Sequence, residues 1–476
     1  MGIDFSASGD QMSDSKRFLG ITVMSPYFQN EGVDGVVSNL VERAGATAVA
    51  CNTSVCAPSE EGKGGFQPPI DAGASVRLFD RPLWGKPALW LRSGPAFESV
   101  SEFYEGCPYQ PRPTNDLTES DGAIIGQFIK GSKSAGLKVY IQTGAAQAPG
   151  IRPVDVPRLP NGEVPRDRMA NTASLASEAV RRYNRAFIRD IFNHYPLVDG
   201  IRPDWPEYPC YKLDEAFQDF GQHVRAWAER HGFDFNSIQE QVGRFYSYLH
   251  GELKNEDLAD FASADQGNFS IFSLLKRFPV IADWLRLKAE LSADILRDYR
   301  ETITECAGED KELSANAFMP PFSTITGLDF GLAAEHCESI SPKLYTMHWS
   351  LIIKFWGDVL LEKNPGLDES LLVRALVHLL DLSEDEPGSS IEDYGYPEPD
   401  EPHPIPNEPQ QRKIRQAIQE AGGKAEIYAL VHGYGPLDDF CRRLQLVADS
   451  EVDGVWINRY GYLSDEKLDA IGQIWR

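Results

Sequence analysis

The residues best suited to chemistry in this sequence lie in one short stretch, VDGIRPDWPEYPCY, at residues 198–211. Its apolar start is typical of a buried strand, and in a strand Arg202 and Asp204 project to the same side because side-chain direction alternates. We expect the Arg202 guanidinium to hold the Asp204 carboxylate ionised. Glu207 follows between two prolines, which stiffen the turn. A rigid aspartate and glutamate beside Trp205 suit the hydrolysis of a glycosidic bond, with one carboxylate as nucleophile or base and the other as proton donor.

The same residues admit a structural interpretation, in which Arg202 and Asp204 form a buried salt bridge at a strand end and Glu207 is merely solvated. Two aromatic residues, Trp205 and Tyr208, flank the carboxylates and favour the functional interpretation. We therefore expect Asp204 and Glu207 to be catalytic.

Eight short, apolar, β-branched runs separated by segments of helical period predict the elements that position these residues. The strands are predicted at residues 17–24, 46–51, 137–142, 198–202, 313–318, 342–347, 425–432 and 452–458, and the helices at residues 33–44, 121–135, 175–195, 213–231, 280–306, 369–382, 411–421 and 437–449. Eight β/α units predict a single (β/α)8 TIM barrel over residues 1–476. The rival is a doubly wound open sheet, but no GxGxxG or P-loop follows the first strand.

Three connections are longer than ordinary loops. Residues 55–120, after the second strand, form a long aromatic-rich loop that we expect on the C-terminal, catalytic face. Residues 236–278 add a helical insertion to the connection after the fourth strand. Residues 383–411, between the sixth and seventh strands, are acidic and Pro-rich and predict no regular element.

The residues that end the predicted strands are polar and aromatic, and a barrel builds its active site from such ends. Aromatic rings stack on the C–H faces of sugars, while amides, histidines and arginine hydrogen-bond to hydroxyls. The substrate-binding residues are predicted to be Arg202, Trp205, Tyr208, Gln142, Asn316, Tyr345, His348, Trp349, His432, Tyr434, Asn458 and Tyr460. The alternative for the two histidines is a satisfied core position, and for Asn458 and Tyr460 a strand end that faces solvent.

The motif DGIRPD, residues 199–204, resembles the fourth-strand motif of the α-amylase-type glycoside hydrolase superfamily, in which DGxRxD carries a nucleophilic aspartate and its arginine partner. Residues 171–211 resemble more closely an uncharacterised glycoside-hydrolase-like (β/α)8-barrel family with a DWPEYP-type turn. The similarity continues more weakly through residues 315–330, 341–350 and 453–461. The resemblance implies a nucleophile-like role for Asp204 with Arg202 beside it.

The sequence departs from the amylase pattern at two strand ends. Asn316-Ala317-Phe318 stands where those enzymes carry a glutamate acid/base, and His432-Gly433-Tyr434 where they carry an aspartate after histidine. The resemblance therefore supplies no proton donor. Glu207 is the first choice for that role, and Asp329, Asp265 or a loop carboxylate is the alternative.

The composition of the chain argues against several classes of binding partner. The chain has 46 Lys and Arg against 71 Asp and Glu, a net charge of −25, which disfavours nucleic acid and anionic membranes. No stretch approaches the roughly 20 apolar residues of a membrane helix, and the start lacks a signal-peptide core, so we expect a cytoplasmic protein. The seven cysteines include no CxxC pair, and a metal site would need a third ligand beside His348 and His432. We expect no cofactor and no metal, and no pattern indicates an oligomeric state.

These observations predict a glycoside hydrolase that acts on a saccharide or glycoside through carboxylate catalysis. The missing carboxylates on the fifth and seventh strands keep a second hypothesis open, a non-hydrolytic carbohydrate-binding pseudoenzyme. A metal-assisted carbohydrate lyase or isomerase, resting on the two histidines, is the third.

Overall fold

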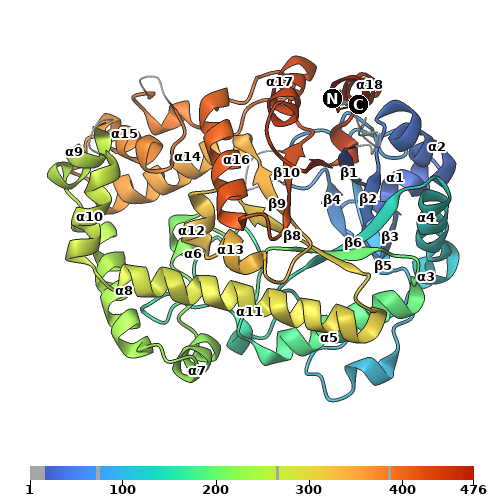
Figure 1. Ribbon diagram of the computed structural model, residues 1–476, viewed down its shortest axis with the longest axis horizontal. Coiled ribbons are helices and arrows are strands. Elements are labelled where there is room, and N and C mark those ends of the chain that lie inside the picture. The colour runs from blue at the N-terminus through green and yellow to red at the C-terminus, as the bar shows by residue number, and fades with distance from the viewer. Residues whose placement is uncertain (1–16, 71–75, 264–266, 384–386, 476) are drawn as a thin grey trace, which may run out of the picture.

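Eight parallel strands close into a barrel in the computed structural model, which describes residues 17–70, 76–263, 267–383 and 387–475. Around the barrel the strands follow the order β1-β11-β10-β9-β8-β7-β6-β2, and most of the connecting helices lie outside it (Figure 1). The barrel strands are β1 (Phe18–Thr22), β2 (Ala48–Cys51), β6 (Lys138–Gly144), β7 (Gly200–Asp204), β8 (Glu312–Phe318), β9 (Ser339–Leu344), β10 (Glu426–His432) and β11 (Gly454–Asn458). The predicted (β/α)8 TIM barrel is confirmed.

The helices that accompany the barrel match the predicted periodic segments, with several additions. They are α1 (Ser25–Asn30), α2 (Val33–Ser38), η1 (Asn39–Arg43), α4 (Ala123–Ser134), η3 (Pro153–Asp155), α5 (Glu178–His194), α6 (Leu213–Ala216), α7 (Gln222–Arg230), α11 (Ile281–Ala307), α12 (Phe322–Thr326), α13 (Phe330–Ala333), α14 (Thr346–Lys363), α15 (Glu369–Leu379), α16 (Asn407–Ala421), α17 (Leu437–Ala448), η5 (Tyr460–Tyr462) and α18 (Asp465–Trp475). Helices α1, α12, α13, α14 and α18 lie outside the predicted helical segments. The last helix packs back on the first strand, where the Trp475 indole donates to the Phe18 carbonyl at 3.1 Å.

The barrel interior is filled by large side chains. Trp456 of β11 is fully buried, and the Arg202 guanidinium lies 3.8 Å from the centre of its ring. Gly20 on the neighbouring strand β1 makes room for this indole, because a Cβ at that position would lie 2.3 Å from a ring carbon. The interior is therefore a packed core, and space for a ligand must lie at its ends.

The aromatic-rich segment after β2 is more regular than a loop. It contains a three-stranded antiparallel sheet in the order β3-β5-β4, followed by two short helices. Its elements are β3 (Ser54–Ser59), β4 (Gly65–Gln67), β5 (Leu89–Pro95), η2 (Ser101–Tyr104) and α3 (Asp116–Asp121).

The other two long connections also carry elements. The helical insertion holds α8 (Phe235–Leu249), α9 (Asn255–Ala262) and α10 (Gly267–Arg277), and α9 lies beside α15 (Figure 1). The acidic, Pro-rich segment was expected to form no regular element. Its described part contains η4 (Ile391–Asp393) and the first turn of α16, because a proline is tolerated where helical amide groups are unpaired.

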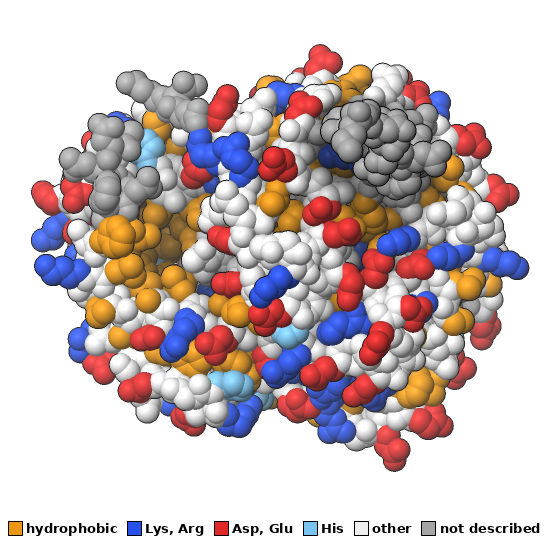
Figure 2. Space-filling model, in the orientation of Figure 1, with side chains coloured by type: hydrophobic (Ala, Val, Ile, Leu, Met, Phe, Trp, Pro, Cys, Tyr) orange, Lys and Arg blue, Asp and Glu red, His pale blue; other side chains and the backbone are white. Residues whose placement is uncertain are grey.

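No helix in the described part of the chain is both long and apolar enough to cross a bilayer. On the face shown in Figure 2, acidic side chains are scattered among basic ones rather than gathered in one field.

Candidate functional site

A cavity of about 350 Å³ opens at the C-terminal ends of the barrel strands, where the fold places ligand sites. It receives side chains from β1, β2, β6, β7 and β11, and from the inserted strand β4. The lining residues are Thr22, Val23, Met24, Ala50, Cys51, Asn52, Gln67, Pro69, Gln142, Thr143, Gly144, Gln147, Asp204, Trp205, Asn458 and Arg459. Four predicted site residues are therefore brought together: Gln142, Asp204, Trp205 and Asn458.

Asp204 ends β7 and is the one carboxylate in the described lining of this cavity. Its Oδ1 lies 2.6 Å from the Nζ of Lys343, and the Asp204 side chain keeps 24% of its surface exposed while that of Lys343 keeps 4%. The lysine comes from β9, two strands away around the barrel. Asp204 is thus paired with a buried cation and remains open to the cavity.

The expected pairing of Arg202 with Asp204 is not what the structure contains. Arg202 is fully buried, and its Nη1 donates to the Ser314 hydroxyl at 2.8 Å while its Nη2 donates to Asn316 Oδ1 at 2.5 Å. Burial lowers the pKa of Arg202 to about 9. Arg202 and Asn316 therefore form a buried polar network inside the barrel, below the strand ends, and neither lines the cavity.

Trp205 forms an aromatic wall beside Asp204. Its backbone has a φ of 62°, a conformation rarely adopted by a bulky residue, so the surroundings must hold it there. Its ring lies 5.4 Å from the Phe318 ring and 5.7 Å from the Tyr211 ring, centroid to centroid, and 4.2 Å from the Lys343 ammonium. These contacts fix the indole at the edge of the cavity.

Glu207 lies outside the cavity lining. The side chain is fully buried, Oε1 accepts from the Phe318 amide at 2.7 Å, and Oε2 accepts from the Thr326 hydroxyl. Burial raises the pKa of Glu207 to about 7, while the charge of Lys343 opposes the rise. Its assignment as proton donor stays a prediction, and the geometry favours another role.

Of the alternative donors named from the sequence, Asp329 does not line the cavity. Asp329 caps α13, where Oδ1 accepts from the Leu332 amide at 2.9 Å. Asp265 lies outside the described residues.

Three of the predicted substrate-binding residues contact other parts of the protein. The Tyr208 hydroxyl is buried between the Leu175 amide and the Asp219 carboxylate. The Tyr460 hydroxyl donates to Glu31 at 2.8 Å. Trp349 lies in α14 rather than at a strand end, because β9 stops at Leu344, and it is buried. None of the three lines the cavity.

The remaining predicted residues form an aromatic and histidine cluster at the ends of β9 and β10. Tyr345 makes edge-on ring contacts with His348 and His432, and His348 Nδ1 lies 2.9 Å from the Tyr211 hydroxyl. The Tyr434 amide donates to His432 Nδ1 at 3.1 Å, and the Tyr434 hydroxyl donates to the Pro397 carbonyl of the acidic segment at 2.7 Å. Tyr211 links this cluster to Trp205.

Both histidines form a hydrogen bond within this cluster, His348 with the Tyr211 hydroxyl and His432 with the Tyr434 amide. Within the described residues, no group of three or more His, Cys, Asp or Glu side chains is arranged to hold a metal ion.

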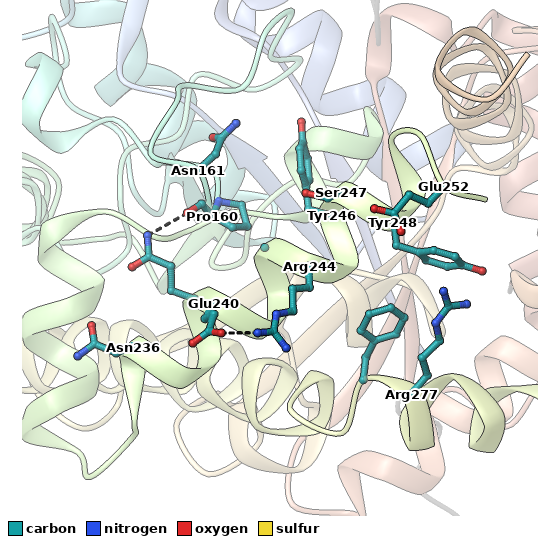
Figure 3. Close-up of a pocket in the computed structure, with 13 residues that line it drawn as sticks. Pro160, Asn161, Asn236, Glu240, Arg244, Tyr246, Ser247, Tyr248, Glu252 and Arg277 are labelled. Atoms are coloured by element: carbon teal, nitrogen blue, oxygen red, sulfur yellow. Dashed lines mark hydrogen bonds and ion pairs between the residues drawn. The ribbon is translucent and has the colours of Figure 1, made fainter.

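A larger cavity, about 790 Å³, lies away from the strand ends on the helical insertion (Figure 3). It is lined mainly by α8, and its labelled charged pair, Glu240 and Arg244, is already joined at 2.6 Å. No barrel strand contributes to its lining, so the smaller cavity at the barrel mouth is the candidate functional site.

Sequence reasoning missed the lysine that pairs with Asp204. Lys343 stands in PKLYTM, and a lysine inside a predicted apolar strand is the sequence signal that could have marked it. In the structure all six residues of β9 are buried. Thr22, Gln67 and Gln147 were also missed. Gln67 comes from the inserted sheet within residues 55–120, which were expected on the C-terminal face, but no local pattern indicates which of their side chains reaches the mouth.

The comparisons with known proteins concern the fold. No protein-family model and no curated protein matches the sequence. Among solved structures, a β-galactosidase from the Antarctic haloarchaeon Halorubrum lacusprofundi is similar with a TM-score of 0.50 and 13% identity, over 95% of this chain and 57% of that one.

Two further structures are similar at lower scores. They are a β-galactosidase from the psychrophilic Marinomonas ef1 (TM-score 0.47, 12% identity, 93% of this chain and 54% of that one) and the catalytic domain of a β-amylase from Paenibacillus polymyxa (TM-score 0.46, 9% identity, 96% and 97%). This chain spans a little over half the length of the two β-galactosidases. At these identities the likeness establishes the barrel fold that this chain shares with the Halorubrum lacusprofundi enzyme.

Proposed function

We propose that the barrel mouth binds a saccharide and hydrolyses a glycosidic bond, with Asp204 as nucleophile or general base. The observation that carries the proposal is the position of Asp204, a partly exposed carboxylate in the 350 Å³ cavity, directly followed by Trp205. A carboxylate beside an aromatic wall suits attack on, or water activation at, a sugar ring that stacks on the indole.

The other lining groups support a neutral, hydroxyl-rich ligand. Amide side chains come from Asn52, Gln67, Gln142, Gln147 and Asn458, and hydroxyls from Thr22 and Thr143. Amides both donate and accept hydrogen bonds, as sugar hydroxyls do. The fold shared with a protein named as a β-galactosidase agrees with this chemistry at the level of reaction class.

A second function, non-hydrolytic saccharide binding, is favoured by one specific observation. Glycoside hydrolysis ordinarily uses two carboxylates at the bond that breaks. Asp204 is the one carboxylate in the described lining of the cavity. The Glu207 oxygens instead accept hydrogen bonds from Phe318 and Thr326.

Replacing Asp204 tests both functions. We expect the wild type to hydrolyse at least one member of a panel of nitrophenyl glycosides, and Asp204→Asn to lose activity by about 10³-fold or more. The variant should stay folded by circular dichroism but melt at a lower temperature, because the buried Lys343 loses its counter-charge. Asp199→Asn is the matched control. Asp199 precedes the same strand at the opposite end of the barrel and is paired with Lys133 at 2.7 Å, so its loss should leave turnover unchanged.

Calorimetric titration with the same glycosides separates the two functions. Binding by the wild type without turnover of any panel member would support the second function. Full activity of Asp204→Asn would contradict the assignment of Asp204.

A further inference from the structure

Lys343 occupies an unusual position for a charged residue. All six residues of β9 are buried, and Lys343 keeps 3% of its surface exposed. Its ammonium group lies 2.6 Å from Asp204 Oδ1, 4.2 Å from the centre of the Trp205 ring and 5.3 Å from that of Phe318. A buried ammonium is costly unless a counter-charge compensates it, and aromatic faces add a smaller stabilisation.

Asp204 is not the only carboxylate that the lysine acts on. Lys343 and Asp204 both act on the charge of Glu207, the lysine favouring the ionised form and the aspartate opposing it. Phe318 joins the groups physically, since its amide binds Glu207 while its ring faces Lys343. The buried lysine therefore contacts one carboxylate, Asp204, which is open to the cavity, and interacts through its charge with a second, Glu207, which is buried.

Two other titratable groups near Glu207, Lys288 and Cys210, also interact with its charge, which acts to raise the pKa of both groups. Lys288 of α11 donates to the Ala216 carbonyl at 2.9 Å and to the Ile325 carbonyl, and burial lowers its pKa to about 7. Burial also raises the pKa of the Cys210 thiol well above its ordinary value. Arg202 is bound by Ser314, Ser341 and Asn316. In the described part of the chain, Lys343 is the cation that contacts Asp204.

We infer that Lys343 is the positioning residue of the candidate site: it holds the Asp204 carboxylate toward the cavity and couples it to Glu207, which acts as a buried charge partner rather than as a proton donor at the reacting bond. The carboxylates and the lysine then carry a net charge of −1 when Glu207 is ionised and zero when it is protonated. The protonation of Glu207 thereby sets the field that Asp204 and its ligand experience. The inference rests on the proposed function only in calling Asp204 the reacting group.

The coupling can be measured without any turnover. In protein labelled with carbon-13 at the glutamate side-chain carboxyl, the Glu207 signal is assigned by its loss in Glu207→Gln and titrated by NMR. Lys343→Met removes the positive charge and nearly preserves the side-chain volume, so the pKa of Glu207 should rise above about 7 by about one unit or more. Asp204→Asn removes the negative neighbour, so the pKa of Glu207 should fall instead.

Opposite shifts are the decisive result, since a general loosening of the structure would move both variants the same way. Lys413→Met is the matched control: Lys413 is a buried lysine of α16 bonded to the Leu380 carbonyl, and its loss should leave the Glu207 titration unchanged. If Lys343→Met does not fold, the Asp204→Asn variant alone tests the inference. A pKa of Glu207 that is unchanged or higher in Asp204→Asn than in the wild type overturns the inference. Equal midpoints in wild type and folded Lys343→Met overturn it as well.

The two proposals fail separately. Opposite shifts in a protein that hydrolyses no glycoside leave the coupling established and reject hydrolysis. Hydrolysis that depends on Asp204, with no shift in either variant, supports the proposed function and rejects the coupling.

Discussion

Asp204 and Glu207 are three residues apart, yet their surroundings give them different chemistry. Asp204 faces a cavity and a lysine, whereas Glu207 is fully buried and receives hydrogen bonds from Phe318 and Thr326. The rigid turn between them separates the two carboxylates rather than aiming both at one ligand. Sequence spacing alone cannot distinguish these outcomes, because a single residue in the left-handed region, Trp205, redirects the chain.

The buried state of Glu207 predicts a pH-dependent contribution to stability. Its pKa is raised from 4.5 to about 7 in the folded protein, so the folded state binds the proton more tightly than the unfolded state does. The contribution is complete below about pH 4.5 and is lost as the pH rises through about 7. Relative to Glu207→Gln, which does not titrate, the wild type should lose about 2 to 3 kcal/mol of unfolding free energy between about pH 5 and about pH 8.

Urea denaturation of both proteins at the two pH values measures this difference. The glutamine can still accept from the Phe318 amide, so the comparison isolates the proton rather than the hydrogen bond. Parallel stability curves for wild type and Glu207→Gln would contradict the buried, protonatable state.

At the scale of elements, the sequence pattern predicts where the strands lie, but it does not predict the surroundings of their side chains. The run that forms β7 was predicted at residues 198–202 and is found at Gly200–Asp204, with Asp204 at its end as expected. The run containing β9 was predicted three residues too late, because apolar and aromatic residues continue from the strand directly into α14. That shift carried His348 and Trp349 to the strand end in the prediction and left Lys343 unnoticed within the strand.

The sequence predicts the site residues that stand at strand ends. It does not predict the contacts that those residues make with other strands of the barrel. Gln142, Asp204, Trp205 and Asn458 were named from the sequence and line the cavity. The partner of Asp204 lies 139 positions further along the chain, by the difference of the two residue numbers. No local pattern favours Lys343 over Arg202 as the partner of Asp204. Strand alternation places Arg202 on the same face as Asp204, but in the structure Arg202 is buried inside the barrel.

The loop after β10 illustrates how a helix holds a strand end in place. Arg443 of α17 is fully buried, donates to the carbonyls of His432 and Tyr434 at 2.8 and 2.7 Å, and pairs with Asp439 at 2.8 Å. Arg443→Met should lower the free energy of unfolding by about 3 to 5 kcal/mol, because it leaves Asp439 and two carbonyls without their buried partner.

Arg442→Met is the natural comparison for this loss. Arg442 pairs with the same aspartate but keeps 33% of its side chain exposed, so its removal should cost about 1 kcal/mol or less. Both values come from urea denaturation at one pH. Equal losses for the two variants would show that burial of Arg443 does not govern the stability of this loop.

At the scale of the whole molecule, the net charge of −25 and the composition of the mouth point to different ligands. A strongly acidic protein attracts cations over long distances. The cavity, however, is lined mainly by amides, hydroxyls and one aromatic wall, with one cationic side chain, Arg459, and its single described carboxylate is compensated by Lys343. On the face shown in Figure 2 the acidic side chains are spread among basic ones, so there they favour solubility rather than form one field that would select a ligand.

This separation predicts saccharide affinity that is insensitive to salt. For a glycoside that binds in the panel described above, the Kd should change by less than about twofold between about 0.05 and 0.5 M NaCl, because a neutral ligand gains little from the screened surface field. Calorimetric titration at the two salt concentrations measures it, and Asp204→Asn should be equally insensitive if it still binds. A Kd that weakens about tenfold in high salt would instead indicate a cationic ligand drawn by the overall charge, and would contradict the neutral-hydroxyl character inferred from the lining.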